Sequence, residues 1–296
     1  MKKKILNIIK PVIIPINKLI LSNYYSGTKD VQNLTEKKVL FLAPHVDDET
    51  IGAGGTLKKY ADFGAETHVV FLTDGSGSKS DKTAKTLVDI RKNEAVQVQN
   101  LLNINSIHFF DEKDGHLQSN QETQQRLKQL IEELKPEVIF APVFVDCHPD
   151  HIATVNLLND TLKLMNEDLS HKIVIRLYEI NTLLPREEIN CIVDVTPYKE
   201  IKEKAVGIFQ SQAIDFDGFL SLSLIKSKLV KDEKVKVVET FCQLNSIELN
   251  ERLQKVKLDL PFSLHFKQVN KEVTLLYAIF KNIRLKEKLY KESRTE

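Results

Sequence analysis

The chain has few cysteines, almost no net charge and no long uninterrupted apolar run. Its three cysteines, Cys147, Cys191 and Cys242, are odd in number and far apart, which argues against a disulfide framework and favours a reducing, cytoplasmic setting. The 42 basic and 41 acidic residues give a net charge of +1, so we expect no nucleic acid partner. With 296 residues, 42% of them hydrophobic, the chain can bury a large core.

Acidic side chains are missing from the first 29 positions, which hold six lysines. Two of these lysines, with Pro11 and Pro15, interrupt the apolar stretch, which argues against both a secretory signal and a membrane-spanning helix. Two interpretations stay open. Residues 1–25 lie flat on the anionic inner face of a membrane, or the segment packs on the protein's own surface.

From residue 37 onward, apolar runs rich in Val, Ile and Phe alternate with helix-like segments. This pattern predicts successive βαβ units and a Rossmann-like three-layer α/β/α sandwich with a mostly parallel sheet. We divide the chain into an N-terminal arm (1–36), a central domain (37–239) and a helical C-terminal extension (240–296) that packs on the domain. Strands are expected at 38–43, 67–74, 106–111, 137–143, 172–180 and 190–196, and helices near 50–63, 81–103, 121–134, 152–166, 197–212 and 271–291.

Polar clusters follow the first and fourth of these strands. In a doubly wound sheet, ligands bind beyond the carboxyl ends of the strands, where the strand order reverses. The first and fourth strands are neighbours in the usual order, so both clusters should face one crevice. The first cluster holds His45, Asp47 and Asp48, and the second holds His148, Asp150 and His151.

These residue types predict a metal site. Two imidazoles and one carboxylate form a common ligand set for catalytic zinc and leave a position open for water. A divalent cation would also offset the repulsion among the adjacent carboxylates of Asp47, Asp48 and Glu49. We expect residues 47 and 48 to alternate in direction on an extended strand end, so that one binds metal while the other takes a proton from the water.

The motifs 44-PHVDDE-49, 52-GAGG-55 and 148-HPDH-151 together resemble the LmbE-like, or PIG-L-type, zinc-dependent N-deacetylases. The resemblance runs from about residue 37 to residue 212. It includes Arg91 and Glu94 in the family's R-x-x-E position and a closing segment that ends in S-Q.

The resemblance implies an enzyme that removes the acetyl group from an N-acetylglucosamine-type amino sugar or glycoconjugate and releases acetate and a free amine. It also implies zinc as the cofactor, with iron(II) as another usable metal. Asp47 would act as general base, and His148 would stabilise the oxyanion. The implied metal ligands are His45, Asp48 and His151, with Asp150 orienting a histidine and Arg91 contacting substrate.

Rival interpretations remain at this point. A non-haem iron(II) oxygenase also uses two histidines and one carboxylate. A carbohydrate-binding protein that keeps its metal without catalysis is another alternative, although such a protein has no need of a spare base at Asp47. A dinucleotide site would use the glycines of 52-GAGG-55, but their spacing differs from G-x-G-x-x-G. The sequence leaves the oligomeric state and the sugar's attached group open.

Overall fold

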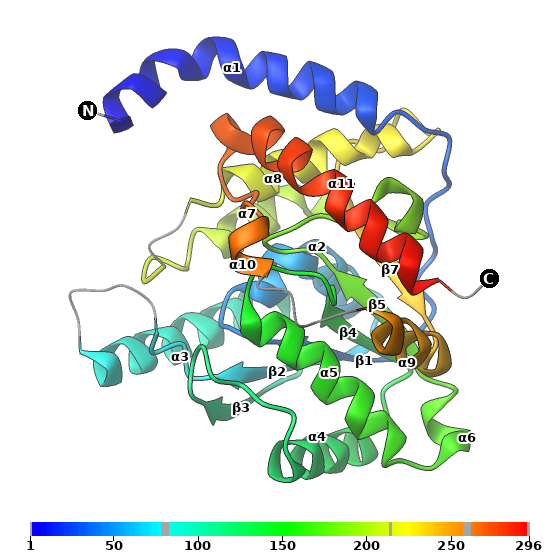
Figure 1. The fold of residues 1–296 in the computed structure, drawn as a ribbon. Helices are drawn as coiled ribbons and strands as arrows, with labels where there is room; N and C mark the ends of the chain where they lie inside the picture. The colour runs from blue at the N-terminus through cyan, green and yellow to red at the C-terminus, as the bar shows by residue number, and fades with distance from the viewer. Residues whose placement is uncertain (1, 78–82, 213–214, 257–261, 295–296) are drawn as a thin grey trace.

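The computed structural model describes residues 2–77, 83–212, 215–256 and 262–294. These residues form the expected α/β sandwich around a seven-stranded sheet (Figure 1). The strand order is β3-β2-β1-β4-β5-β7-β6, and the first five strands are parallel. The strands are β1 (Lys38–Ala43), β2 (Glu66–Thr73), β3 (Ser106–Glu112), β4 (Val138–Pro142), β5 (Val174–Tyr178), β6 (Cys191–Asp194) and β7 (Val238–Leu244).

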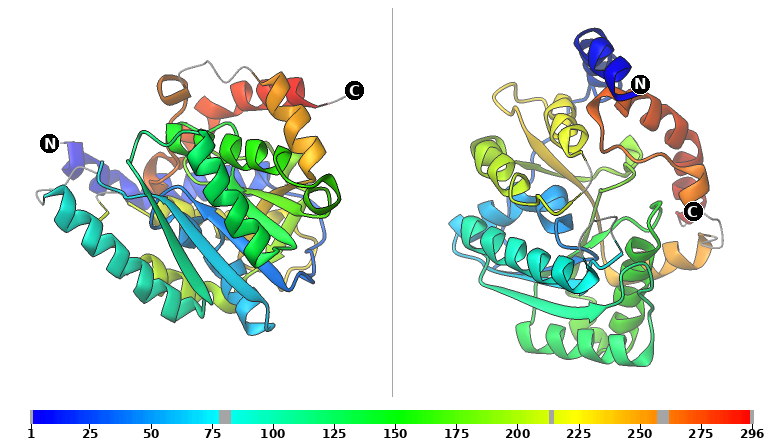
Figure 2. Two further views of the ribbon diagram at one scale, coloured as in Figure 1. Left: turned by 90° about the horizontal axis from the view of Figure 1, so that it is seen from below. Right: turned by 90° about the vertical axis from the view of Figure 1, so that its left-hand side faces the viewer.

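Helices cover both faces of the sheet, so the central strands are buried on two sides. Helices α2, α3 and α7 pack together on one face, and α4, α5 and α9 on the other (Figure 2). Every residue from Val39 to Ala43 is fully buried, which explains the unbroken apolar run of β1. The helices are α2 (Asp48–Asp62), α3 (Ala84–Leu102), α4 (Gln121–Leu134), α5 (Pro149–Lys163), α6 (Glu167–Ser170), α7 (Lys199–Val206), α8 (Asp217–Ile225), α9 (Ser246–Lys255), α10 (Phe262–His265) and α11 (Leu275–Ser293).

Strand β7 was not expected from the sequence. It runs antiparallel between β5 and β6 and lies across residue 239, where the central domain was expected to end. Two buried polar residues, Glu239 and Thr240, interrupt its apolar pattern, and each has a partner inside the fold. Glu239 pairs with Lys202, and Thr240 accepts a hydrogen bond from Lys226. The division into arm, domain and extension stays a prediction.

The helix expected over 197–212 is shorter in the structure. A 3₁₀ turn (Thr196–Tyr198) leads into α7, which ends at Val206. The following residues turn back toward the site instead of continuing the helix, and this places Ser211 and Gln212 against α3 and the turn after β1.

The N-terminal arm is helix α1 (Lys2–Tyr24), which contains both prolines. It packs on the protein's own surface: Leu21 is fully buried, and the Asn17 side chain donates a 2.9 Å hydrogen bond to the carbonyl of Glu272. Among the helices of the described ranges, none combines the length and apolar character that crossing a bilayer requires.

Candidate metal centre and active site

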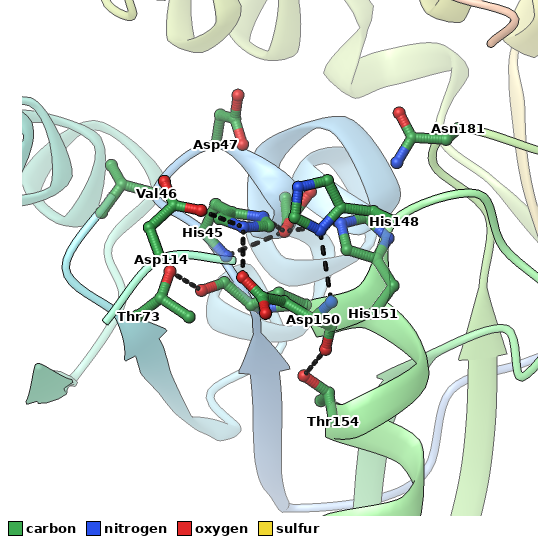
Figure 3. A network of polar contacts seen from close by, with 12 residues as sticks. His45, Val46, Asp47, Thr73, Asp114, His148, Asp150, His151, Thr154 and Asn181 are labelled. Carbon is green, nitrogen blue, oxygen red and sulfur yellow. Dashed lines mark hydrogen bonds and ion pairs between the residues drawn. The ribbon is translucent and has the colours of Figure 1, made fainter. Parts of the chain in front are cut away.

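The two polar clusters meet beyond the carboxyl ends of neighbouring strands, as the sequence predicted. β1 and β4 pair in parallel with Phe41 opposite Phe140, so the segments that follow them emerge side by side. Figure 3 shows His45, His148 and His151 gathered with Asp114 and Asp150 above the end of β1. A pocket of about 630 Å³ opens to solvent over this group.

The chain does not continue as an extended strand through residues 47 and 48, so that expectation was wrong. β1 ends at Ala43, and Asp48 is already the first residue of α2. Between them Asp47 adopts φ 133° and ψ −28°, a conformation that costs about 1–3 kcal/mol for a residue other than glycine. The two carboxylates of Asp47 and Asp48 are therefore carried by a tight turn and not by an extended strand. The Asp47 N–H donates to Glu49 Oε2 at 3.1 Å, which helps to hold this turn.

Helix α2, which carries Asp48, is broken at Ala53 (φ −151°, ψ 23°). The break frees two backbone N–H groups, and Glu239 on β7 accepts both, from Gly55 at 2.9 Å and from Thr56 at 2.7 Å. A carboxylate at the start of the second half of α2 also suits the helix dipole. The break is therefore a capped and supported feature of the helix.

A buried lysine completes this support. Lys202 Nζ on α7 donates to the carbonyl of Ile51 at 2.8 Å and to Glu239 Oε1 at 2.6 Å. The Lys202–Glu239 ion pair thus joins the two halves of α2, and both its side chains are almost completely buried. Close packing at Gly52 fixes the same helix from the sheet side, since a Cβ there would lie 2.5 Å from Tyr178 Cδ2.

Two imidazole nitrogens approach one carboxylate oxygen. His45 Nδ1 lies 3.2 Å from Asp48 Oδ2, and His151 Nε2 lies 3.5 Å from the same atom. Burial disfavours charged histidines, but the surrounding carboxylates outweigh it: they raise the pKa of His45 well above its usual value and that of His151 to about 10. The donors and the demand for positive charge fit a divalent cation.

Other groupings of the same side chains also meet the distance requirement for a metal. One ring nitrogen from each of His45, His148 and His151 lies within 4.8 Å of the other two. Ligand atoms of His45, Asp114, His148 and Asp150 also all lie within 4.8 Å of one another. These side chains therefore form a candidate metal site, while the exact ligand set of His45, Asp48 and His151 stays a prediction.

Asp146 orients the second cluster and was missed from the sequence. Its fully buried carboxylate lies 3.5 Å from His151 Nδ1 through Oδ1. The same oxygen accepts the His148 backbone N–H at 2.9 Å and the Asn181 side-chain N–H at 3.1 Å. With Nδ1 facing the Asp146 carboxylate at ion-pair distance, His151 presents Nε2 toward Asp48, as expected of a histidine ligand.

Asp150 and Asp114 engage the far nitrogen of His45. Asp150 Oδ2 lies 3.2 Å and Asp114 Oδ1 3.4 Å from His45 Nε2. The Asp150 carboxylate is fixed by the N–H groups of Gly115 at 2.7 Å and Leu117 at 3.1 Å. Asp150 is thus placed to orient His45. Asp114 was missed although it follows β3, and the rule that ligands gather at strand ends could have found it.

His148 has the geometry of a neutral hydrogen-bond donor. Its Nδ1 accepts the Asp150 backbone N–H at 3.3 Å, so in the neutral ring the proton sits on Nε2. Burial, together with the neighbouring His45 and His151, lowers the pKa of His148 to about 4. The ring is therefore neutral at physiological pH, and its Nε2–H can donate.

Asp47 stands apart from the contacts drawn as dashed lines in Figure 3 and lines the pocket with His148. Burial, and next the charge of Asp48, raise its pKa well above the usual range for an aspartate. Such a carboxylate can accept a proton and hold it at neutral pH.

Arg91 also lines the pocket, but it is buried and engaged within the protein. Its Nη2 donates to Gln212 Oε1 at 2.7 Å, and the Gln212 side chain donates to the carbonyl of Val46 at 2.9 Å. Glu94, one turn along α3, accepts a 2.9 Å hydrogen bond from the Ser211 N–H. The R-x-x-E pair thus holds the S-Q segment against the turn that carries Asp47.

Comparison with known proteins agrees with this site. Residues 40–162 match the family model PIG-L: GlcNAc-PI de-N-acetylase. The chain is 33% identical over 120 residues to a diacetylchitobiose deacetylase of Thermococcus kodakarensis, an alignment that covers 39% of this chain and 45% of that protein. It is also 27% identical over 136 residues to a 4-oxalmesaconate hydratase of Pseudomonas putida, covering 43% of this chain and 52% of the hydratase. The chain spans about half the length of these two relatives.

A solved structure extends the similarity to most of the fold. The N,N'-diacetylchitobiose deacetylase of Pyrococcus horikoshii superimposes with a TM-score of 0.64 at 26% identity. The superposition covers 83% of this chain and 94% of that one. The likeness thus reaches well beyond the segment that the family model matches.

Proposed function

Because this chain belongs to the PIG-L / LmbE-like de-N-acetylase family, we propose that it is a metal-dependent hydrolase that deacetylates an N-acetylglucosamine-type amino sugar or glycoconjugate. The observation that carries the proposal is the set of roles around one pocket. Two histidine nitrogens converge on Asp48. Asp47 lines the pocket outside these contacts and can act as a base, and His148 offers a hydrogen-bond donor.

A divalent ion, zinc in our proposal, would be held by His45, Asp48 and His151, where it would polarise the amide carbonyl and lower the pKa of water to about 7. Asp47 takes a proton from the water whose oxygen attacks the acetyl carbon. The Nε2–H of His148 donates to the oxygen of that carbonyl as it gains negative charge. Asp47 then returns the proton to the departing nitrogen as the C–N bond breaks, which yields acetate and a free amine.

The remaining residues hold this arrangement. Asp146 and Asp150 keep the rings of His151 and His45 in place through the contacts described above. We propose that Arg91 positions the substrate through Gln212, because its guanidinium is bonded to that side chain at the pocket wall.

The test is release of acetate and primary amine from a panel of free, oligomeric and lipid-linked N-acetylglucosamine compounds by the zinc-loaded protein. Asp47→Asn should retain zinc and lose turnover. The matched control is Asp232→Asn, which should behave as wild type because Asp232 is exposed and does not line the pocket. A fully active Asp47→Asn protein would overturn the base assignment.

The same assay separates the alternatives. Activity that needs oxygen and iron(II) would indicate an oxygenase. Because one relative is a 4-oxalmesaconate hydratase, that compound belongs in the panel, and hydration of it without acetate release from any sugar would reject the deacetylase. Zinc binding with no turnover at all would favour a carbohydrate-binding role.

A further inference from the structure

Helix α1 leaves an apolar side uncovered. Val12, Ile16 and Leu19 recur at the spacing of one helix face and are 64%, 48% and 74% exposed. Pro15 between them is exposed as well. In Figure 1 and in the right-hand view of Figure 2, α1 forms the outermost edge of the molecule.

The other side of α1 is attached to the protein, which fixes the direction in which the stripe faces. Asn17 bonds to the carbonyls of Glu272 and Val273 in the turn before α11. Lys18 pairs with Glu272 at 2.8 Å, and Lys10 approaches Asp217 at 3.8 Å. The helix is therefore anchored by one face, and the apolar stripe lies on the other.

Exposed apolar side chains are concentrated in this region. The described part of the chain exposes thirteen large hydrophobic residues, and six of them lie on α1 and the first two turns of α11. Two of the six, Tyr277 and Phe280, are aromatic and more than half exposed. Aromatic side chains of this kind favour the boundary between water and lipid.

The positive charge of the N-terminal segment favours an anionic membrane as the partner of this face. Six lysines and no acidic residue precede residue 30, so the rest of the chain carries a net charge of −5 against +1 for the whole. The positive charge is thus concentrated on the arm that carries the apolar stripe. This combination matches a helix that lies in the plane of an anionic bilayer surface.

We propose that α1 docks the protein on an anionic lipid surface, with Val12, Ile16 and Leu19 entering the interface and the net positive charge of the first 29 residues favouring the approach. The helix lies on the surface and does not span the bilayer. This inference stands apart from the catalytic proposal, because it depends only on the exposed face and charge of α1.

Co-sedimentation of the full-length protein with lipid vesicles tests the proposal. Vesicles of phosphatidylcholine mixed with phosphatidylglycerol should retain the protein, and vesicles of phosphatidylcholine alone should retain far less. The double variant Ile16→Glu/Leu19→Glu should lower partitioning about tenfold or more, because carboxylates replace apolar groups facing anionic lipid. Val96→Glu changes an exposed aliphatic residue on α3 and should bind like wild type.

Equal binding by wild type and the double variant would overturn the proposal, as would wild-type protein that stays in solution with both kinds of vesicle. Light scattering, which measures the oligomeric state, provides a second test. If wild type is a dimer that Ile16→Glu/Leu19→Glu converts to a monomer, the stripe is covered by a second copy of the chain and the membrane assignment is wrong.

Discussion

Replacing Lys202 by methionine tests how the broken helix α2 is held together. Methionine keeps an unbranched side chain, one atom shorter than that of lysine, but removes the cation that joins the Ile51 carbonyl to Glu239. The Glu239 carboxylate would stay buried with only the N–H groups of Gly55 and Thr56 as partners. Asp48 sits at the start of this helix, so the change bears on the metal centre as well.

The expected magnitude follows from burial. Removing one partner of a buried ion pair costs about 3–5 kcal/mol, because the other charge is left uncompensated. Two backbone donors still reach Glu239, which favours the lower end, and the Ile51 carbonyl loses a partner that normally contributes about 1 kcal/mol. We therefore expect Lys202→Met to lower the free energy of unfolding by about 3 kcal/mol.

Urea unfolding, followed by circular dichroism on metal-free protein, measures this free energy. Lys199→Met is the matched control, because Lys199 lies on the same helix and pairs with Glu203 at 2.8 Å in an exposed setting. An exposed pair contributes about 0.5 kcal/mol or less. The double variant Lys202→Met/Glu239→Gln should recover part of the loss. If Lys202→Met costs no more than Lys199→Met, the ion pair does not support the break in α2.

Three further changes probe the site. His148→Ala should lower kcat by about 10²–10³ while zinc stays bound; loss of zinc measured by metal analysis would instead make His148 a ligand. Asp146→Asn should weaken zinc binding by about 10–100-fold in a chelator competition, and unchanged affinity would contradict its orienting role. Gly52→Ala should cost about 1–3 kcal/mol in urea unfolding, because its Cβ would meet Tyr178 at 2.5 Å. Gly54→Ala, where the same atom would meet side chains only at 3.4 Å or more, is the control, and equal costs would refute the packing argument.

Much of the fold could be predicted because buried parallel strands have an unmistakable pattern. Runs such as 39-VLFLA-43 are apolar throughout, and the helices between them have ordinary length. Strand β7 was not predicted because its polar residues Glu239 and Thr240 resemble surface positions until their lysine partners are known. Those partners lie 37 and 14 residues away, beyond the reach of a local pattern.

The site was predictable to the extent that its residues follow strands directly. The adjacency of the motifs around His45 and His151 followed from the strand order, which the structure confirms. The backbone at Asp47 could not be foreseen, because an aspartate at φ 133° has no local sequence signal. Asp146 was overlooked because it stands two positions before the recognised motif, and only the folded chain shows which ring it contacts.

The single oxygen of Asp146 that contacts His151, the His148 backbone and Asn181 constrains how this centre could be redesigned or could diverge. A change at His151 that retunes metal preference would also shift the oxygen that positions the His148 backbone, so metal choice and the hydrogen-bond donor would change together. Substitutions around His45, whose far nitrogen is contacted by Asp114 and Asp150 instead, leave that oxygen untouched. An engineer seeking a different metal without moving the His148 backbone should therefore begin with Asp114, because the His45 ring itself packs against the ring of His148.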